Sequence, residues 1–276
     1  MEYRYKRVYG GRVQLVVFDW AGTTVDFGCQ APVEAFVAGF RDKGVEVSVA
    51  AARIPMGMEK RDHIKAMAEF DEVAAAWKRV HGRAIGDRDI DILYDDFAGH
   101  LLNSIEAKST LLNGVVEVAA LLREDGVKIG ASTGYFSDAA EIVVNKAGES
   151  GYKPDFAVCA SDVEGGRPAP WMLYRVMEAL QVYPPEAVIN VGDTPVDMAT
   201  GLNGGVWSVG IALTGNQMGV SEQELAALDP VEYKRRLGEA RKSLYRAGAH
   251  YVIDTITEFP RVVAQINDCL ARGERP

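Results

Sequence analysis

Residues 13–26 read VQLVVFDWAGTTVD, an apolar run that ends in an aspartate. The run from Val13 to Phe18 is rich in β-branched residues, which is typical of a strand buried on both faces of a parallel sheet. Asp19 follows at the carboxyl end of this strand, the edge at which ligands bind in open α/β sheets. The stretch therefore predicts the first strand of an α/β core with a carboxylate in a position to do chemistry.

Five further apolar runs predict the rest of the sheet. They span residues 127–133, 156–160, 188–192, 206–212 and 251–253. Helical patterns lie between the later runs, and alternation of strands with helices indicates a mostly parallel sheet. We therefore predict an α/β fold with a doubly wound, Rossmann-like core.

The alternation fails between residues 32 and 107, where nearly every pattern is helical. We expect helices over residues 32–43, 55–70, 72–80 and 89–105. An all-helical block after the first strand predicts an inserted cap domain that lies over the carboxyl edge of the sheet. The predicted division is a core of residues 1–27 and 108–276 and a cap of residues 28–107. Cys29 lies at the hinge, where we favour packing over a place near the site.

The composition narrows the classes of function. The 276 residues are 48% hydrophobic and 25% charged, as in a globular protein, and the formal net charge is −9. An acidic chain lacks the basic field that general nucleic-acid binding requires. No run of about 18 apolar residues predicts a membrane span, and the residues before Arg12 show no signal-peptide pattern and form an unassigned tail. With three cysteines and no CxxC pair, we expect a cytoplasmic protein.

Three strand ends carry polar residues in a suggestive order. Asp19 follows the first strand, Thr133 and Gly134 close the second, and Asp193 and Asp197 follow the fourth. Carboxylate and carbonyl oxygens at one sheet edge suit Mg²⁺, which also binds phosphoryl oxygens. Alternatively, Asp19 and Asp193 cap the helices that follow their strands. The combination of three strand ends favours a magnesium-dependent site.

With these residues the chain resembles the haloacid dehalogenase superfamily of phosphotransferases. Its motifs are Asp-x-Asp-Gly-Thr, a Ser or Thr, a Lys or Arg, and an acidic pair, matched here by Asp19, Thr133, Arg167 and the pair Asp193 and Asp197. The resemblance implies that Asp19 attacks phosphorus. It also implies Mg²⁺ ligands from Asp19, the main-chain carbonyl of Ala21 and Asp193, with Asp197 in the outer shell.

One departure from that pattern changes the expected chemistry. Ala21 stands where the superfamily has its second Asp, the acid that protonates a departing alkoxide. Cleavage of a carbon–phosphorus bond needs an electron sink in place of an acid, and a lysine imine supplies one. Lys60 shares the apolar stripe of a predicted helix with Ile64 and Met67, which should lower its pKa. Alternatively, Lys60 extends its ammonium group to solvent.

A closer resemblance, to the phosphonoacetaldehyde hydrolase family, runs from about Val13 to Ala264. It rests on Ala21 combined with Lys60 and on five segments, namely residues 18–26, 55–63, 133–135, 166–171 and 191–194. The resemblance implies a Lys60 imine whose proton transfers His63 assists, a homodimer joined through the caps, and substrate contacts from Met56, Thr133, Gly134, Tyr135 and Arg167. A surface ion pair between helices is the alternative for Arg167.

The resulting hypothesis is a hydrolase that converts phosphonoacetaldehyde to acetaldehyde and phosphate through an imine and an aspartyl-phosphate. One rival is a phosphatase of the same superfamily without an imine, in which His63 replaces the missing acid. A second rival, favoured by Ala21 alone, is a binding module descended from an inactive phosphatase.

Overall fold

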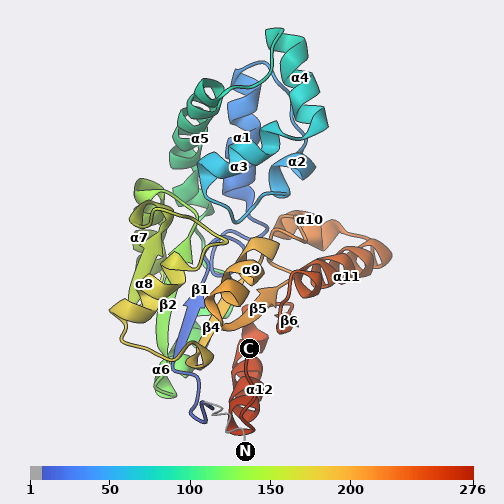
Figure 1. Ribbon diagram of the computed structural model, residues 1–276. Coiled ribbons are helices and arrows are strands. Elements are labelled where there is room, and N and C mark those ends of the chain that lie inside the picture. The colour runs from blue at the N-terminus through green and yellow to red at the C-terminus, as the bar shows by residue number, and fades with distance from the viewer. Residues whose placement is uncertain (1–7) are drawn as a thin grey trace, which may run out of the picture.

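The computed structural model describes residues 8–276 (Figure 1). Six strands form one parallel sheet in the order β3-β2-β1-β4-β5-β6, the order of a doubly wound dinucleotide-binding fold. All six lie where the apolar runs predict them, within two residues at either end. Their bounds are β1 Leu15–Phe18, β2 Lys128–Thr133, β3 Phe156–Cys159, β4 Val188–Gly192, β5 Trp207–Ile211 and β6 Tyr251–Ile253.

Twelve α-helices and three short 3-10 turns connect these strands within residues 8–276. The helices are α1 Gln30–Asp42, α2 Val49–Arg53, α3 Lys60–Ala68, α4 Asp71–His81, α5 Asp87–Lys108, α6 Val115–Glu124, α7 Ser137–Glu149, α8 Trp171–Ala179, α9 Pro195–Gly204, α10 Glu222–Ala227, α11 Pro230–Arg246 and α12 Phe259–Ala271.

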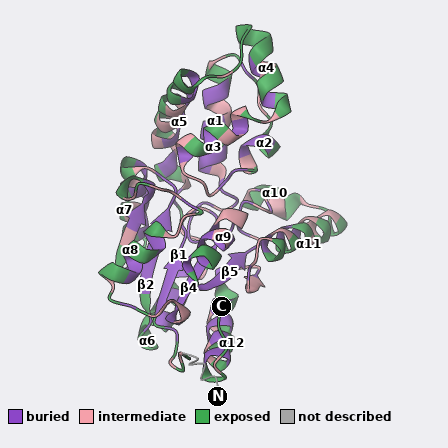
Figure 2. Cartoon of the chain, viewed as in Figure 1, coloured by how far each residue is buried: buried purple, intermediate pink, exposed green. Residues whose placement is uncertain are grey.

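Helices cover both faces of the sheet, as its apolar strands require. Along β1, Val16 and Phe18 pack into a cluster with α6 and α12, whereas Leu15 and Val17 pack against α8 on the other face. All four side chains are buried, and Figure 2 shows the strands as the most buried part of the chain. The alternation follows from the period of two along a strand, and it confirms the predicted α/β fold with its doubly wound sheet.

The residues between β1 and β2 form a separate group of helices, α1 to α5, beyond the carboxyl ends of the strands (Figure 1). At its centre the Phe36 ring stacks on His63 at a centroid distance of 3.8 Å and on Phe97 at 4.2 Å. This helical insertion fits the predicted cap, although its exact boundaries at residues 28 and 107 stay a prediction.

Two details of the cap differ from the prediction. The short helix α2 was missed, and the helix expected from residue 55 begins only at Lys60. Gly57 has φ +96°, a left-handed conformation that interrupts a helix. The Glu59 carboxylate then accepts hydrogen bonds from the main-chain N–H groups of Arg61 and Asp62 and caps α3. Residues 54–59 thus form a loop, which we call the cap loop.

The two connections between core and cap lie side by side. The N–H of Leu112 donates to the Thr24 carbonyl at 2.9 Å, and Val25 forms a β-bridge with Leu111. These bonds place both hinge segments at one point, directly above β1.

At the N-terminus, residues 1–7 of the predicted tail lie outside the described residues, and Tyr9 packs against the core. Among residues 8–276, no helix combines the length and apolar character needed to cross a membrane.

Candidate active site

A small cavity lies where the strand ends meet the cap. The register pairs Phe18 with Ala131 on one side and with Val191 on the other, so β1, β2 and β4 end within two residues of one another. Their following loops therefore converge beneath the cap loop. The lining residues are Asp19, Ala21, Cys29, Pro32, Met56, Gly57, Lys60, Thr133, Gly134, Tyr135, Arg167, Asp193 and Thr194.

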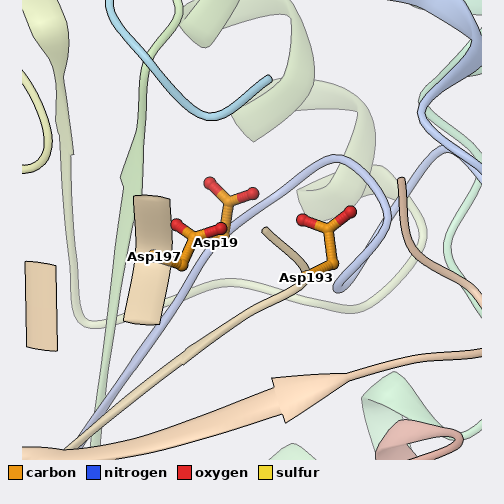
Figure 3. A group of neighbouring side chains, drawn as sticks. All are labelled: Asp19, Asp193 and Asp197. Carbon is orange, nitrogen blue, oxygen red and sulfur yellow. The ribbon is translucent and has the colours of Figure 1, made fainter. Parts of the chain in front are cut away.

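Three aspartates gather at this edge (Figure 3). One carboxylate oxygen from each of Asp19, Asp193 and Asp197 lies within 4.8 Å of the others, and all three residues are buried. Neither Asp19 nor Asp193 caps a helix, because α1 begins eleven residues after Asp19 and the side-chain cap of α9 is Thr194. The capping alternative is therefore wrong for both.

Asp193 is the carboxylate best suited to bind a cation. Its Oδ2 accepts a hydrogen bond from the Asn216 N–H at 2.6 Å and one from the Cys29 thiol at 3.1 Å. Its Oδ1 is buried and has no hydrogen-bond partner among the described residues. Burial, followed by the charges of Asp19 and Asp197, raises the pKa of Asp193 well above its ordinary value. An ionised carboxylate is unfavourable in such a buried and negatively charged place unless a cation binds it. Mg²⁺ prefers oxygen ligands, so it fits this position.

Arg167 joins the other two aspartates. Its Nη1 lies 2.9 Å from Asp19 Oδ1 and 2.5 Å from Asp197 Oδ1, and its Nη2 donates to the carbonyl and hydroxyl of Ser132. The Arg167 side chain is only 2% exposed, so the alternative of a surface ion pair is wrong.

The two aspartates that contact Arg167 differ in their other contacts. Asp197 uses Oδ1 for Arg167 and Oδ2 for the hydroxyl of Thr194 at 2.6 Å, an arrangement that suits an outer-shell group. Asp19 contacts Arg167 through Oδ1 and also lines the cavity. Burial raises the pKa of Asp19 to about 6, with Arg167 opposing that rise and Asp197 adding to it.

The loop after β1 approaches Asp193 so closely that residue 22 must be glycine. Gly22 has φ +77°, and a Cβ placed there would lie 2.3 Å from Asp193 Oδ2. The Gly22 carbonyl also accepts a hydrogen bond from Thr214 at 2.8 Å. Ala21 therefore lines the cavity at a fixed position beside Asp19, where the superfamily pattern has its acid.

Lys60 enters the cavity from the cap as the first residue of α3. It is 3% exposed, so the alternative in which its ammonium reaches solvent is wrong, and its predicted partners Ile64 and Met67 are buried with it. Its Nζ lies 5.3 Å from the ring centre of Tyr135 and 5.9 Å from that of Phe36. Burial lowers the pKa of Lys60 to about 8, against the opposing charge of Asp19.

His63 lies outside the cavity lining, one helical turn behind Lys60. Its Nε2 is 2.9 Å from the carbonyl of Ala52, which only accepts, so the proton of the neutral ring sits on Nε2. Nδ1 is left buried without a partner among the described residues. Burial, with the Lys60 charge, lowers the pKa of His63 well below its ordinary value. Its part in proton transfer stays a prediction.

The remaining predicted contacts meet across the boundary between core and cap. Thr133 Oγ1 accepts from the N–H of Tyr135 at 3.1 Å, which orders the turn after β2. A Cβ on Gly134 would lie 2.7 Å from the carbonyl of Met58, so the core turn and the cap loop touch here. Met56, in the same loop, is 4% exposed and lines the cavity. Nine of the eleven predicted site residues thus line one cavity, with Asp197 and His63 behind it.

Comparison with known proteins agrees with this geometry. A family model described as haloacid dehalogenase-like hydrolase matches residues 13–205. The chain is 46% identical to a phosphonoacetaldehyde hydrolase-like protein of Syntrophobacter fumaroxidans, with 97% of each chain covered. It is 44% identical to a phosphonoacetaldehyde hydrolase of Bacillus cereus, with 92% of this chain and 97% of the other covered.

The chain belongs to the phosphonoacetaldehyde hydrolase family of haloacid dehalogenase-like hydrolases. A solved structure of a phosphonoacetaldehyde hydrolase-like protein from Oleispira antarctica matches the whole chain with a TM-score of 0.97 and 38% identity.

In this hydrolase the structure also places two residues beyond the predicted site set. Cys29 lines the cavity and donates a hydrogen bond to Asp193, so the alternative of a place near the site holds for the hinge cysteine and packing alone is wrong. Asn216 holds Asp193 from the loop after β5. That loop lies at the carboxyl edge of the sheet, which is the one signal in the sequence that pointed to it.

Proposed function

We propose that the chain hydrolyses the carbon–phosphorus bond of phosphonoacetaldehyde, giving acetaldehyde and phosphate. The observation that carries this proposal is the buried Lys60, which shares one cavity with Asp19 while Ala21 occupies the position of the superfamily acid. A lysine with a pKa near 8 offers a substantial fraction of free amine at mildly alkaline pH.

The proposed reaction begins when the Lys60 amine condenses with the substrate aldehyde and releases water. Asp19 attacks phosphorus, and the electron pair of the carbon–phosphorus bond passes into the imine to form an enamine. Protonation of the enamine carbon and hydrolysis of the imine release acetaldehyde. Water then cleaves the aspartyl-phosphate and frees phosphate. Arg167, with Thr133 and the Gly134 N–H, would hold the phosphonyl oxygens during these steps.

Phosphate release from substrates with and without an aldehyde tests this proposal against its rivals. We expect release from phosphonoacetaldehyde and at most trace release from ethylphosphonate or from simple phosphate esters. Release from esters without the aldehyde would favour a phosphatase, and no release from any compound would favour a binding module.

We also propose that Mg²⁺ completes the site, held by Asp19, the Ala21 carbonyl and Asp193. The unpartnered Oδ1 of Asp193 supports this assignment. A bound cation would screen the repulsion between a carboxylate nucleophile and an anionic phosphonate.

Chelation should therefore abolish turnover, and added Mg²⁺ should restore it. Asp193→Asn should lower Mg²⁺ affinity, measured by calorimetry, by at least about tenfold. Full activity in a metal-stripped sample would exclude this role for Asp193.

The pKa of Lys60 leads to a pH prediction. The ammonium form of Lys60 cannot attack an aldehyde, and its pKa is about 8 because the side chain is buried. The rate of borohydride trapping with substrate should fall about tenfold for each pH unit below about 8 and level off above it. A trapping rate that keeps rising with pH up to the ordinary lysine pKa would show that burial does not lower the pKa of this amine.

Ala21→Asp tests why the superfamily acid is missing. The new carboxylate would add negative charge beside the phosphonate and would have no departing oxygen to protonate. We expect carbon–phosphorus cleavage to fall about 10²-fold, with any gain confined to phosphate esters. A variant that hydrolyses phosphonoacetaldehyde as well as its parent does would contradict this account.

Two further proposals concern the setting of the enzyme. We propose a homodimer joined through the caps, supported by the exposed apolar side chains of Val49, Ile54 and Val80 on the cap. Light scattering should give about twice the chain mass of 30.0 kDa, and a monomeric mass would contradict it.

We also propose a cytoplasmic location, supported by three cysteines that form no disulfide among the described residues. Cell fractionation tests it.

A further inference from the structure

We infer that Arg53 is a positioning residue that locks the Lys60 part of the cap onto the core. Arg53 ends helix α2, just before the cap loop that leads to Lys60. Its role deepens the proposed function and rests on it, because the locked element carries the imine-forming lysine.

Arg53 joins three segments that are distant in the sequence. Its Nη1 donates to the hinge carbonyl of Gly28 at 2.7 Å and to the side-chain oxygen of Asn216 at 3.1 Å. Asn216 returns a hydrogen bond from its side-chain nitrogen to the Arg53 carbonyl at 3.0 Å. Cap, hinge and core are thus fastened by one guanidinium and one amide, which we call the Arg53–Asn216 clasp.

The core side of the clasp reaches the metal-binding edge directly. The main-chain N–H of Asn216 donates to Asp193 Oδ2 at 2.6 Å, and Asn216 is 3% exposed. The main chain at Gly219 also packs closely against the Arg53 guanidinium. Gly219 has φ +65°, and a Cβ placed there would lie 3.2 Å from Arg53 Nε.

The cap side of the clasp reaches Lys60 through helix α3. The His63 ring donates from Nε2 to the carbonyl of Ala52, the residue before Arg53. α2 and α3 are therefore bonded to each other, and the clasp fixes this unit to the core beside the contact between the cap loop and the Gly134 turn. Loss of the Arg53 contacts would free the α2–α3 unit to tilt away from the core, with Lys60 on its inner end. A displacement of about 1 Å is enough to slow a positioned reaction about 10²-fold.

Four variants test this inference, namely Arg53→Met, Asn216→Ala, their double mutant and Arg41→Met. Methionine keeps much of the bulk at residue 53 and removes the donors. Asn216→Ala removes the side-chain half of the clasp but keeps the main-chain N–H that holds Asp193. Arg41 lies on the exposed face of α1, where its ion-pair partner within residues 8–276 is the exposed Glu46, so its variant is the matched control.

The first measurement is hydrogen exchange of residues 49–68 without substrate. We expect at least about tenfold faster exchange in Arg53→Met and Asn216→Ala. The double mutant should exchange faster than either single variant but by less than the product of the two effects, because both variants remove the same Arg53–Asn216 side-chain bond. The second is the rate of borohydride trapping at Lys60 with phosphonoacetaldehyde, which should fall at least about tenfold in the same variants. Mg²⁺ affinity should stay within about threefold in Asn216→Ala, and Arg41→Met should match the parent throughout.

Unchanged exchange and trapping in Arg53→Met would overturn the inference, and so would losses that multiply in the double mutant. The failure of the proposed function gives a different pattern. If the parent protein itself takes up no adduct at Lys60, the imine is excluded, while the exchange measurement still decides whether the clasp holds the cap.

Discussion

Lys60→Arg should abolish carbon–phosphorus cleavage, with a loss of at least about 10³-fold in kcat/KM. Arginine keeps the positive charge and much of the length, but its guanidinium stays protonated and forms no imine. A loss of this size corresponds to about 4 kcal/mol of transition-state stabilisation. The fold should be retained, and binding of phosphate in the presence of Mg²⁺ should persist, because Arg167 and the aspartates are untouched.

Borohydride trapping makes the Lys60 test specific. Parent protein treated with substrate and borohydride should gain a two-carbon adduct at Lys60 and at no other lysine, as read by mass spectrometry. Lys65→Arg, an exposed position on the same helix, is the matched control and should behave as the parent does. An adduct at another lysine, or substantial turnover by Lys60→Arg, would exclude the Lys60 imine from the mechanism and favour the phosphatase hypothesis.

Asp19→Asn should remove activity and at the same time stabilise the metal-free protein. The amide cannot attack phosphorus, and we expect kcat to fall by at least about 10⁴-fold. The stability effect follows from the pKa of Asp19, which burial raises from 3.8 to about 6.

The sign of that effect is set by proton binding. The folded protein binds the Asp19 proton more tightly than the unfolded chain does, so stability falls as pH rises from about 4 to about 6 and stays lower above. At pH 8 the ionised carboxylate costs up to about 3 kcal/mol, a cost that asparagine avoids. Urea unfolding with chelator should show a more stable variant at pH 8 and near-equal stabilities at pH 3.

The exposed Asp95→Asn is the control for the unfolding measurement and should leave stability unchanged at both pH values. A less stable Asp19→Asn at pH 8 would mean that the ion pair with Arg167 outweighs burial and the repulsion from Asp197. Retained turnover by the same variant would exclude Asp19 as the nucleophile.

Most of the fold could be predicted because its signals are local. Each strand is an apolar run that the sheet buries on both faces, and the absence of such runs between residues 32 and 107 predicted the helical insertion. The misplaced start of α3 has a local cause of another kind. A left-handed Gly57 and the capping carboxylate of Glu59 outweighed a pattern that continued apolar residues back to Pro55.

The candidate site was also predicted in large part, since strand ends of a parallel sheet converge at one edge. Asp19, Thr133 and Asp193 could be placed on that edge from their positions after apolar runs. The spacing of Lys60 to Ile64 and Met67 placed it on an apolar stripe, but by itself that spacing favoured an ammonium group that reaches solvent. Only the resemblance to the family favoured a buried lysine, because helical spacing says nothing about which surface the helix packs against.

The sequence by itself determined the set of chemical groups and the elements that carry them, because those depend on periodicity and on neighbouring residues. The tertiary structure alone decided how the groups are paired. Arg167 bridges Asp19 and Asp197, Cys29 and Asn216 share one oxygen of Asp193, and Arg53 binds the hinge and the core. Such pairings depend on strand order, register and the angle at which the cap meets the core. These packing relations bring residues from 23 to 164 positions apart to within hydrogen-bond distance, and no local pattern encodes them.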